Sequence, residues 1–279
     1  MNIAVIGAGT MGSGIALLCA KCEMNTTIIE VDQEKLKAAE KNGRSLLAKL
    51  VEKQKMTEGE KDEILSRLAY SPKIEEIAKA DIILEAISED FILKKDLYEN
   101  IKKYAPKNVF LFTNTSGLSI TELSAAAPDA ESFMGLHFFN PPMMMNLIEL
   151  VRGKHTSDET YAKAKAFAAA LHKTTVDAPE TAGFIVNRIL IPMINEAAYL
   201  VSEGVKAVEI DTAMKLGANL PMGPLELGDF IGIDIVVAVM ENLHRGLGSE
   251  KYLPCPLFAD MIAQGRLGRK TAKGFFDYK

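Results

Sequence analysis

Short apolar runs and longer amphipathic stretches alternate through the first part of this chain. Runs with the length of a buried strand occur at residues 3–6, 27–31, 82–85, 109–113 and 133–137. Stretches with a helical spacing of apolar residues lie at 12–22, 33–54, 58–68, 93–104 and 120–126. Strands that alternate with helices in this way predict a parallel sheet with right-handed crossovers.

The pattern changes after an apolar run at residues 147–151. One helix at 158–171 and one short strand at 174–177 precede Pro179, and only helical patterns follow, at 183–203, 206–216, 225–243 and 257–264. We therefore predict an α/β fold, in which a Rossmann-type doubly wound sheet over residues 1–180 is followed by an all-helical domain over residues 181–279. A length of 279 residues suits two domains.

A glycine-rich turn joins the first predicted strand to the first predicted helix. The residues of this turn that are candidates for cofactor binding are Gly7, Gly9, Thr10, Met11 and Gly12. Strand, G-x-G-x-x-G and helix is the order that binds a dinucleotide pyrophosphate. Asp32 follows Gly12 at the distance where a carboxylate accepts hydrogen bonds from the adenosine ribose, which favours NAD over NADP. The alternative is a packing element that binds no ligand.

Composition narrows the class of protein. The formal net charge is −5 and no basic arm is present, so we expect no nucleic-acid partner. We find no signal peptide and no apolar run long enough for a bilayer, and we expect a cytoplasmic protein. Cys19 and Cys22 lie well inside a predicted helix without a second pair at zinc spacing, so we interpret them as packed thiols and expect no metal site.

Polar residues follow two of the predicted strands, at the edge where ligands of parallel sheets bind. Residues 114–116, Asn-Thr-Ser, follow the strand at 109–113 and would lie near the nicotinamide end of a cofactor. A turn with a helix cap is the simpler interpretation of the same residues. His137 ends the strand at 133–137, where a histidine can accept the proton of an alcohol that loses hydride.

Two further polar residues have both a functional and a structural interpretation. Glu149 lies within the apolar run at 147–151, and such a carboxylate needs a partner, which His137 would provide. It can equally point to solvent from an edge strand. Asn187, at the start of the helix at 183–203, has an amide that can serve the active site or cap the helix.

The second predicted helix has one basic face inside an acidic chain. Lys41, Ser45, Lys49 and Lys53 follow one another at i, i+4 spacing. This face suggests an anionic substrate with several phosphates. A solvated helix face explains the same pattern.

Several motifs together resemble the 3-hydroxyacyl-CoA dehydrogenase family, over essentially the whole chain. They are the glycine turn at 7–12, Asn-Thr-Ser at 114–116, GLHFFNP at 135–141, GFIVNR at 183–188, DTAM at 211–214, PMGP at 221–224 and GRKT at 268–271. Two departures concern the acyl pocket: Gly117 stands where many relatives carry a second serine, and three methionines occupy 143–145.

The resemblance implies a role for each site residue. His137 and Glu149 would be the catalytic pair, with Ser116 and Asn187 as supporting polar groups. The positions that match cofactor contacts of the family are Asp32, Glu89, Lys94, Asn140 and Lys270, beside Asn114 at the nicotinamide. Ser45 and Lys53 fall near positions that contact CoA in the family. Lys49 lies between them and is a further candidate for substrate binding. The helical domain would form a homodimer.

The reaction implied is the NAD-dependent interconversion of (S)-3-hydroxybutyryl-CoA and acetoacetyl-CoA, as in butyrate fermentation. Two alternatives remain at this point. One is a related β-hydroxyacid dehydrogenase that acts on a substrate without CoA and does not need the basic helix face. The other is a dinucleotide-binding protein without catalytic activity, which would not need the His137–Glu149 pair.

Overall fold

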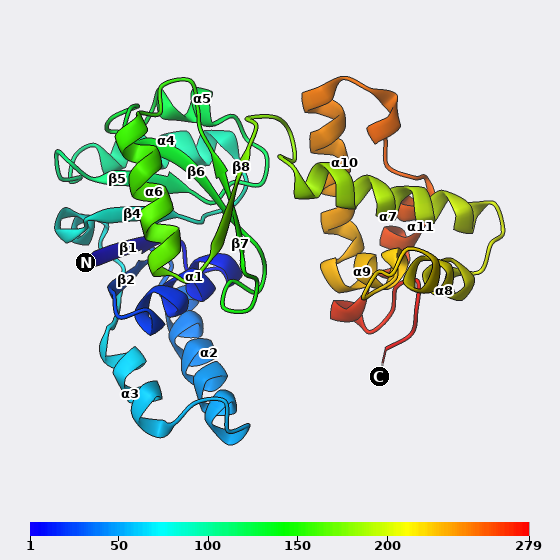
Figure 1. The fold of residues 1–279 in the computed structure, drawn as a ribbon, viewed down its shortest axis with the longest axis horizontal. Helices are drawn as coiled ribbons and strands as arrows, with labels where there is room; N and C mark the ends of the chain where they lie inside the picture. Colours follow the sequence, from blue (N-terminus) through cyan, green and yellow to red (C-terminus); the bar gives the residue numbers. More distant parts are fainter. Residues whose placement is uncertain (279) are drawn as a thin grey trace. The chain divides into compact units, whose positions relative to one another are not determined.

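The computed structural model describes residues 1–278, which form two compact units that meet in the sequence between Glu180 and Thr181. The first unit contains one eight-stranded sheet in the order β3-β2-β1-β4-β5-β6-β7-β8 (Figure 1). Its strands are β1 (Asn2–Ile6), β2 (Asn25–Ile29), β3 (Leu68–Ser71), β4 (Ile82–Glu85), β5 (Phe110–Thr113), β6 (Phe133–Phe138), β7 (Leu147–Val151) and β8 (Thr174–Ala178). The strand order reverses between β1 and β4, where ligands of doubly wound sheets bind.

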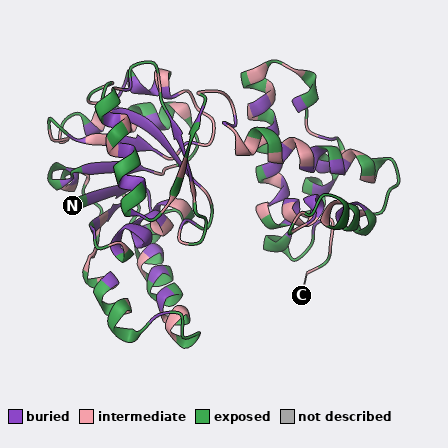
Figure 2. Cartoon of the chain, viewed as in Figure 1, coloured by how far each residue is buried: buried purple, intermediate pink, exposed green. Residues whose placement is uncertain are grey.

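Helices cover both faces of this sheet. They are α1 (Thr10–Lys21), α2 (Gln33–Glu52), α3 (Glu58–Ser66), α4 (Phe91–Ile101), α5 (Ile120–Ser124) and α6 (Asp158–Ala170), with a 3₁₀ turn at Ile74–Lys79. The buried side chains of α1 and α6 share one core with alternate residues of the strands. On the other face the ring of Tyr98 in α4 packs edge-on against the ring of Phe133 in β6, with 5.3 Å between the ring centroids. The central strands are buried on both faces (Figure 2).

The doubly wound α/β fold is confirmed, but the sheet is not entirely parallel. Strand β7 runs antiparallel to β6, and β8 runs parallel to β7. The connection over residues 139–146 is too short for the crossover of roughly a dozen residues that a parallel neighbour requires. The prediction also missed β3, because this short strand is half-exposed and shows no apolar run.

Helices α2 and α3 extend beyond the sheet as a hairpin (Figure 1). Asp32 caps α2 by accepting hydrogen bonds from the backbone N–H groups of Glu34 and Lys35. Thr57 and Glu60 form a reciprocal capping box at the start of α3. Both helices of the hairpin therefore begin at a side-chain cap.

The second unit is all-helical in its described residues, as expected. Its helices are α7 (Val186–Ser202), α8 (Ala207–Gly217), α9 (Pro224–Ile231), α10 (Ile233–Leu247) and α11 (Leu257–Ala263). The single helix that was expected at 225–243 is two helices, since the backbone at Gly232 adopts φ +108°. Asp229 holds the C-terminal segment by accepting hydrogen bonds from the N–H groups of Phe275 and Phe276.

None of the helices that the structure describes is both long enough and apolar enough to cross a bilayer.

Candidate active site

The glycine turn has the shape that a dinucleotide pyrophosphate requires. Helix α1 begins directly after Gly9, so the N–H groups of its first turn have no helical acceptor and point out of the helix end. A Cβ atom at Gly12 would lie 2.0 Å from the carbonyl oxygen of Gly7, which explains why helix and strand approach so closely only with glycine. A Cβ at Gly9 would meet nothing within 4 Å, which leaves open space beside the backbone. The turn therefore fits a bound phosphate.

A cavity of about 390 Å³ lies beyond the carboxyl ends of β1 and β2. Apolar side chains form much of its wall, including Ile29, Ile74 and Ile87, and Glu30 also lines it. One oxygen of the Glu30 carboxylate accepts a hydrogen bond from the backbone N–H of Ala8 in the glycine turn, at 3.3 Å. An apolar cavity with a carboxylate beside the glycine turn fits the adenosine half of a dinucleotide.

Asp32 caps a helix in the structure, and its predicted contact with the ribose stays a prediction. Its carboxylate caps α2, and the side chain does not line the adenosine-sized cavity. Strand β2 ends at Ile29, so Glu30 is the first residue past the strand. Glu30 is the first charge after the apolar residues of β2 and is a second candidate for the ribose contact, beside Asp32, which the spacing of roughly twenty residues indicates.

His137 and Glu149 lie opposite each other on β6 and β7. Met134, Leu136, Ile148 and Leu150 belong to the core beneath α1 and α6. Because side chains alternate along a strand, His137 and Glu149 must both point to the other face. Their side chains meet with 2.6 Å between Nδ1 of His137 and Oε2 of Glu149.

Both members of this pair are withdrawn from solvent: 5% of His137 and 0% of Glu149 is exposed. The interpretation in which Glu149 points to solvent from an edge strand therefore does not hold. With Nδ1 engaged by the carboxylate, Nε2 is the ring nitrogen that can exchange a proton with a substrate. The ring of Phe139 packs beside the imidazole, with 4.6 Å between the ring centroids.

The Asn114–Ser116 loop is tied to its surroundings on both sides. The side-chain oxygen of Asn114 accepts a hydrogen bond from the N–H of Phe138 at 2.8 Å, beside His137. The Glu89 carboxylate accepts from the N–H of Ser116 and from the hydroxyl of Thr115, both at 2.6 Å. The structure thus brings Asn114, Ser116, Glu89 and His137 into one region at the carboxyl edge of the sheet.

Lys94 has two carboxylate partners in the structure. Its side chain is 0% exposed, and its ammonium lies 2.5 Å from Oε1 of Glu85 and 3.7 Å from Oε2 of Glu89. A group with no exposed surface does not present itself to a ligand in this conformation. The contact of Lys94 with a cofactor stays a prediction.

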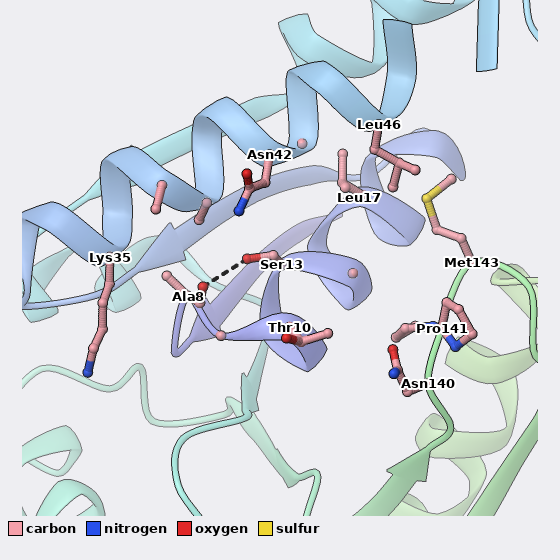
Figure 3. Close-up of a pocket in the computed structure, with 16 residues that line it drawn as sticks. Ala8, Thr10, Ser13, Leu17, Lys35, Asn42, Leu46, Asn140, Pro141 and Met143 are labelled. Atoms are coloured by element: carbon pink, nitrogen blue, oxygen red, sulfur yellow. Dashed lines mark hydrogen bonds between the residues drawn. The ribbon is translucent and has the colours of Figure 1, made fainter. Parts of the chain in front are cut away.

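A groove of about 540 Å³ runs between α1, α2 and the loop after β6 (Figure 3). Its lining includes Gly9, Thr10, Ser13, Asn42, Leu46, Asn140, Pro141 and Met143. Figure 3 shows Met143 near Leu46 at one end and Lys35 at the other. One end of the groove thus adjoins the glycine turn, and the face of α2 that forms its wall continues along the helix.

Lys49 and Lys53 extend that wall, because residues 42, 46, 49 and 53 share one helical face. Both side chains are exposed, as are Lys41 and Ser45 on the adjacent row. Among residues 1–278, neither Lys49 nor Lys53 has an acidic partner within 4.0 Å, whereas Arg44 pairs with Glu40. The basic face thus leads away from the apolar groove.

Two candidate residues belong to the second unit. Asn187 lies in the first turn of α7 and is half-buried. Lys270 lies in a 3₁₀ turn, with its ammonium 2.5 Å from Oδ1 of Asp234. Their roles at the reacting oxygen and at the cofactor stay predictions.

Comparisons with known proteins cover both units. A family model for the NAD binding domain of 3-hydroxyacyl-CoA dehydrogenase matches residues 2–181, and the model for the C-terminal domain of the same family matches residues 183–278. A Bacillus subtilis protein described as a probable 3-hydroxybutyryl-CoA dehydrogenase is 44% identical over all of this chain and 97% of its own length. A 3-hydroxybutyryl-CoA dehydrogenase of Clostridioides difficile is 44% identical over all of this chain and 99% of its own. The crystal structure of (S)-3-hydroxybutyryl-CoA dehydrogenase from Ralstonia eutropha superimposes with a TM-score of 0.93 at 41% identity, and covers all of this chain and 99% of that one.

Proposed function

Because the chain belongs to the 3-hydroxyacyl-CoA dehydrogenase family, we propose that it interconverts (S)-3-hydroxybutyryl-CoA and acetoacetyl-CoA with NAD. The buried His137–Glu149 pair, at the same edge of the sheet as the glycine turn, is the observation that carries the proposal. A packed core does not need an imidazole and a carboxylate there, whereas proton transfer to and from an alcohol does.

The glycine turn and the cavity beside Glu30 would hold NAD, which would supply the hydride acceptor for the 3-carbon of the substrate and, in its reduced form, the hydride donor. In the reductive direction His137, as imidazolium, gives its Nε2 proton to the oxygen of the 3-carbonyl. In the oxidative direction the same nitrogen accepts the hydroxyl proton. Glu149 holds the ring through Nδ1 and stabilises its positive charge. Ser116 and Asn114, fixed by Glu89 and by the N–H of Phe138, provide hydrogen-bonding groups beside the histidine.

Glu30 is the proposed acceptor of the adenosine ribose hydroxyls. Replacing it with Gln should raise the KM for NADH by roughly 10- to 100-fold, since hydrogen bonds to a charged group are lost. The same change removes the charge that repels a 2′-phosphate, so the preference for NADH over NADPH should narrow. Steady-state rates with both reduced cofactors measure both effects.

The matched control is Asp32→Ala, which removes the cap of α2 and leaves Glu30 in place. This variant should lose about 0.5–2 kcal/mol of stability against urea and keep the NADH/NADPH preference of the unmodified protein. A variant of Asp32 that changes the preference, together with a variant of Glu30 that does not, would return the ribose contact to Asp32.

The groove beside the glycine turn is the proposed site of the pantetheine chain, and Lys49 and Lys53 are the proposed partners of the CoA phosphates. Reversing both charges with Lys49→Glu and Lys53→Glu should raise the KM for acetoacetyl-CoA by about tenfold, because two attractions become repulsions. The effect should shrink with added salt. An acetoacetyl thioester without the nucleotide should show an unchanged KM.

The matched control reverses two other charges, with Lys103→Glu and Lys107→Glu. Both residues are exposed and precede β5, so they lie at the amino ends of the parallel strands. Equal effects of the two double reversals would mean that overall charge, and not a phosphate site on α2, sets the KM. An unchanged KM for acetoacetyl-CoA in both double variants would favour a substrate without CoA.

We further propose a cytoplasmic homodimer that serves short-chain acyl-CoA metabolism, including the formation of butyrate. Large apolar side chains exposed on the second unit support self-association, among them Leu216 at 82%, Ile189 at 69% and Val208 at 55%. Sedimentation equilibrium should give twice the chain mass of 30.4 kDa. A mass equal to one chain at micromolar concentration would contradict the dimer.

A further inference from the structure

A buried polar cluster lies beside the candidate active site, on the same face of the sheet as His137 and Glu149. Its centre is Glu85, the last residue of β4, and its other members are Lys94 and Tyr98 of α4 and Thr113 of β5. Each of these residues is 0% exposed. The cluster is therefore a set of polar groups that water does not reach.

Each oxygen of the Glu85 carboxylate accepts two hydrogen bonds. Oε1 accepts from the ammonium of Lys94 at 2.5 Å and from the N–H of Ile87 at 2.7 Å. Oε2 accepts from the hydroxyls of Tyr98 at 2.6 Å and Thr113 at 2.7 Å. Burial, and then the neighbouring carboxylate, raise the pKa of Tyr98, which keeps its hydroxyl a donor.

One branch of this cluster leads to the active-site loop. Lys94 also faces Glu89, at 3.7 Å, and Glu89 accepts hydrogen bonds from the N–H of Ser116 and the hydroxyl of Thr115. Glu89 itself keeps 31% of its side-chain surface exposed. A carboxylate on the surface is thus held from beneath by a buried cation, which in turn is held by Glu85.

We propose that Glu85 and Lys94 are positioning residues for the reaction: their buried ion pair fixes Glu89 and, through it, Ser116. The inference rests on the proposed function, since it assigns the loop a catalytic task. Packing alone does not explain the pair, because well-packed apolar residues are often as stable as a buried ion pair. The pair supplies instead a fixed positive charge beneath Glu89, which an apolar residue cannot supply.

The test uses Glu85→Gln with Lys94→Met in one chain, which removes both buried charges together and leaves none unpaired. Its kcat with NADH and acetoacetyl-CoA should fall by between about tenfold and a hundredfold, as expected for a displaced active-site group. Glu89→Gln, at an exposed carboxylate, should lower kcat by a similar factor. Adding Glu89→Gln to the double variant should lower kcat no further, because all three residues act through one contact.

Hydrogen exchange of the amides at residues 115–118 gives a readout that needs neither cofactor nor activity. Exchange there should be faster in the double variant and in Glu89→Gln, because both loosen the acceptor of the Ser116 N–H. Tyr98→Phe is the matched control: it removes a hydrogen bond from Oε2 of Glu85 and leaves the branch through Lys94 intact. It should keep the exchange and the kcat of the unmodified protein.

A folded double variant with unmodified kcat and unmodified exchange at 115–118 would overturn the positioning role. Effects of the double variant and of Glu89→Gln that multiply would overturn it as well. Should the double variant not fold, Glu85→Gln with Lys94→Gln, which also leaves no buried charge unpaired, gives the same comparison with and without Glu89→Gln. These outcomes differ from failure of the proposed function, in which the unmodified protein would not oxidise NADH with acetoacetyl-CoA.

Discussion

Replacing His137 with Asn is expected to lower kcat by roughly 10²- to 10⁴-fold, the range for loss of a general acid–base group. The asparagine amide nitrogen can take the place of Nδ1 and donate a hydrogen bond to Glu149, so β6 and β7 should stay paired. It cannot carry a proton to the 3-oxygen of the substrate. The measurement is steady-state oxidation of NADH with acetoacetyl-CoA.

Binding of NADH separates a chemical defect from a structural one. The dissociation constant of NADH, from fluorescence titration, should match that of the unmodified protein, because the glycine turn and Glu30 are untouched. His155→Asn is the control, since that histidine is exposed and lies after β7. Near-normal kcat in His137→Asn would remove the histidine from the mechanism.

Replacing Glu149 with Gln should lower kcat by about 10²- to 10⁴-fold as well, because histidine–carboxylate pairs lose this much when the carboxylate becomes an amide. Gln has the same shape, so it fits the fully buried position between β6 and β8. An amide has no charge to stabilise the imidazolium and leaves the tautomer of the ring unfixed.

The double variant His137→Asn with Glu149→Gln distinguishes a working pair from two separate contributions. Residues that act as one unit are not additive, so the double variant should be no slower than His137→Asn alone. A kcat for the double variant equal to the product of both losses would contradict the pairing as the source of activity. A wild-type kcat in Glu149→Gln would make the carboxylate dispensable.

The fold was predictable to the extent that it depends on local pattern. Apolar runs at β1, β4, β5 and β6 and the helical spacing between them gave the doubly wound sheet, because burial on both faces demands continuous apolar residues. Strand β3 is half-exposed and gave no such signal. The break at Gly232 was also missed, since apolar residues continue on both sides of it.

The site was predictable where a single motif holds its parts together. The glycine turn can be recognised from the sequence because its strand, glycines and helix are adjacent in the chain. For the His137–Glu149 pair, the residues left two interpretations and the resemblance implied the pairing; the structure decides between them, because the antiparallel direction of β7 sets these two residues opposite each other. From the sequence alone, an edge strand with Glu149 in solvent explained the same residues.

Glu30 and Glu85 show what sequence spacing cannot decide. Asp32 and Glu30 both lie in the three residues between the end of β2 and the start of α2, and their roles depend on where these two elements end and begin. In the sequence Glu85 is only the last residue of a predicted strand. Its partner Lys94 lies nine residues later, in α4. Burial of a charged pair depends on how α4 packs on the sheet, which no local pattern states.

Oxidation of NADH by the purified protein should be followed in parallel with acetoacetyl-CoA and with free acetoacetate. We expect rapid oxidation with acetoacetyl-CoA, formation of the (S)-alcohol, and little or no reaction with the free acid. Oxidation that is as fast with free acetoacetate would contradict a CoA substrate. Binding of NADH without oxidation by either substrate would contradict the dehydrogenase itself.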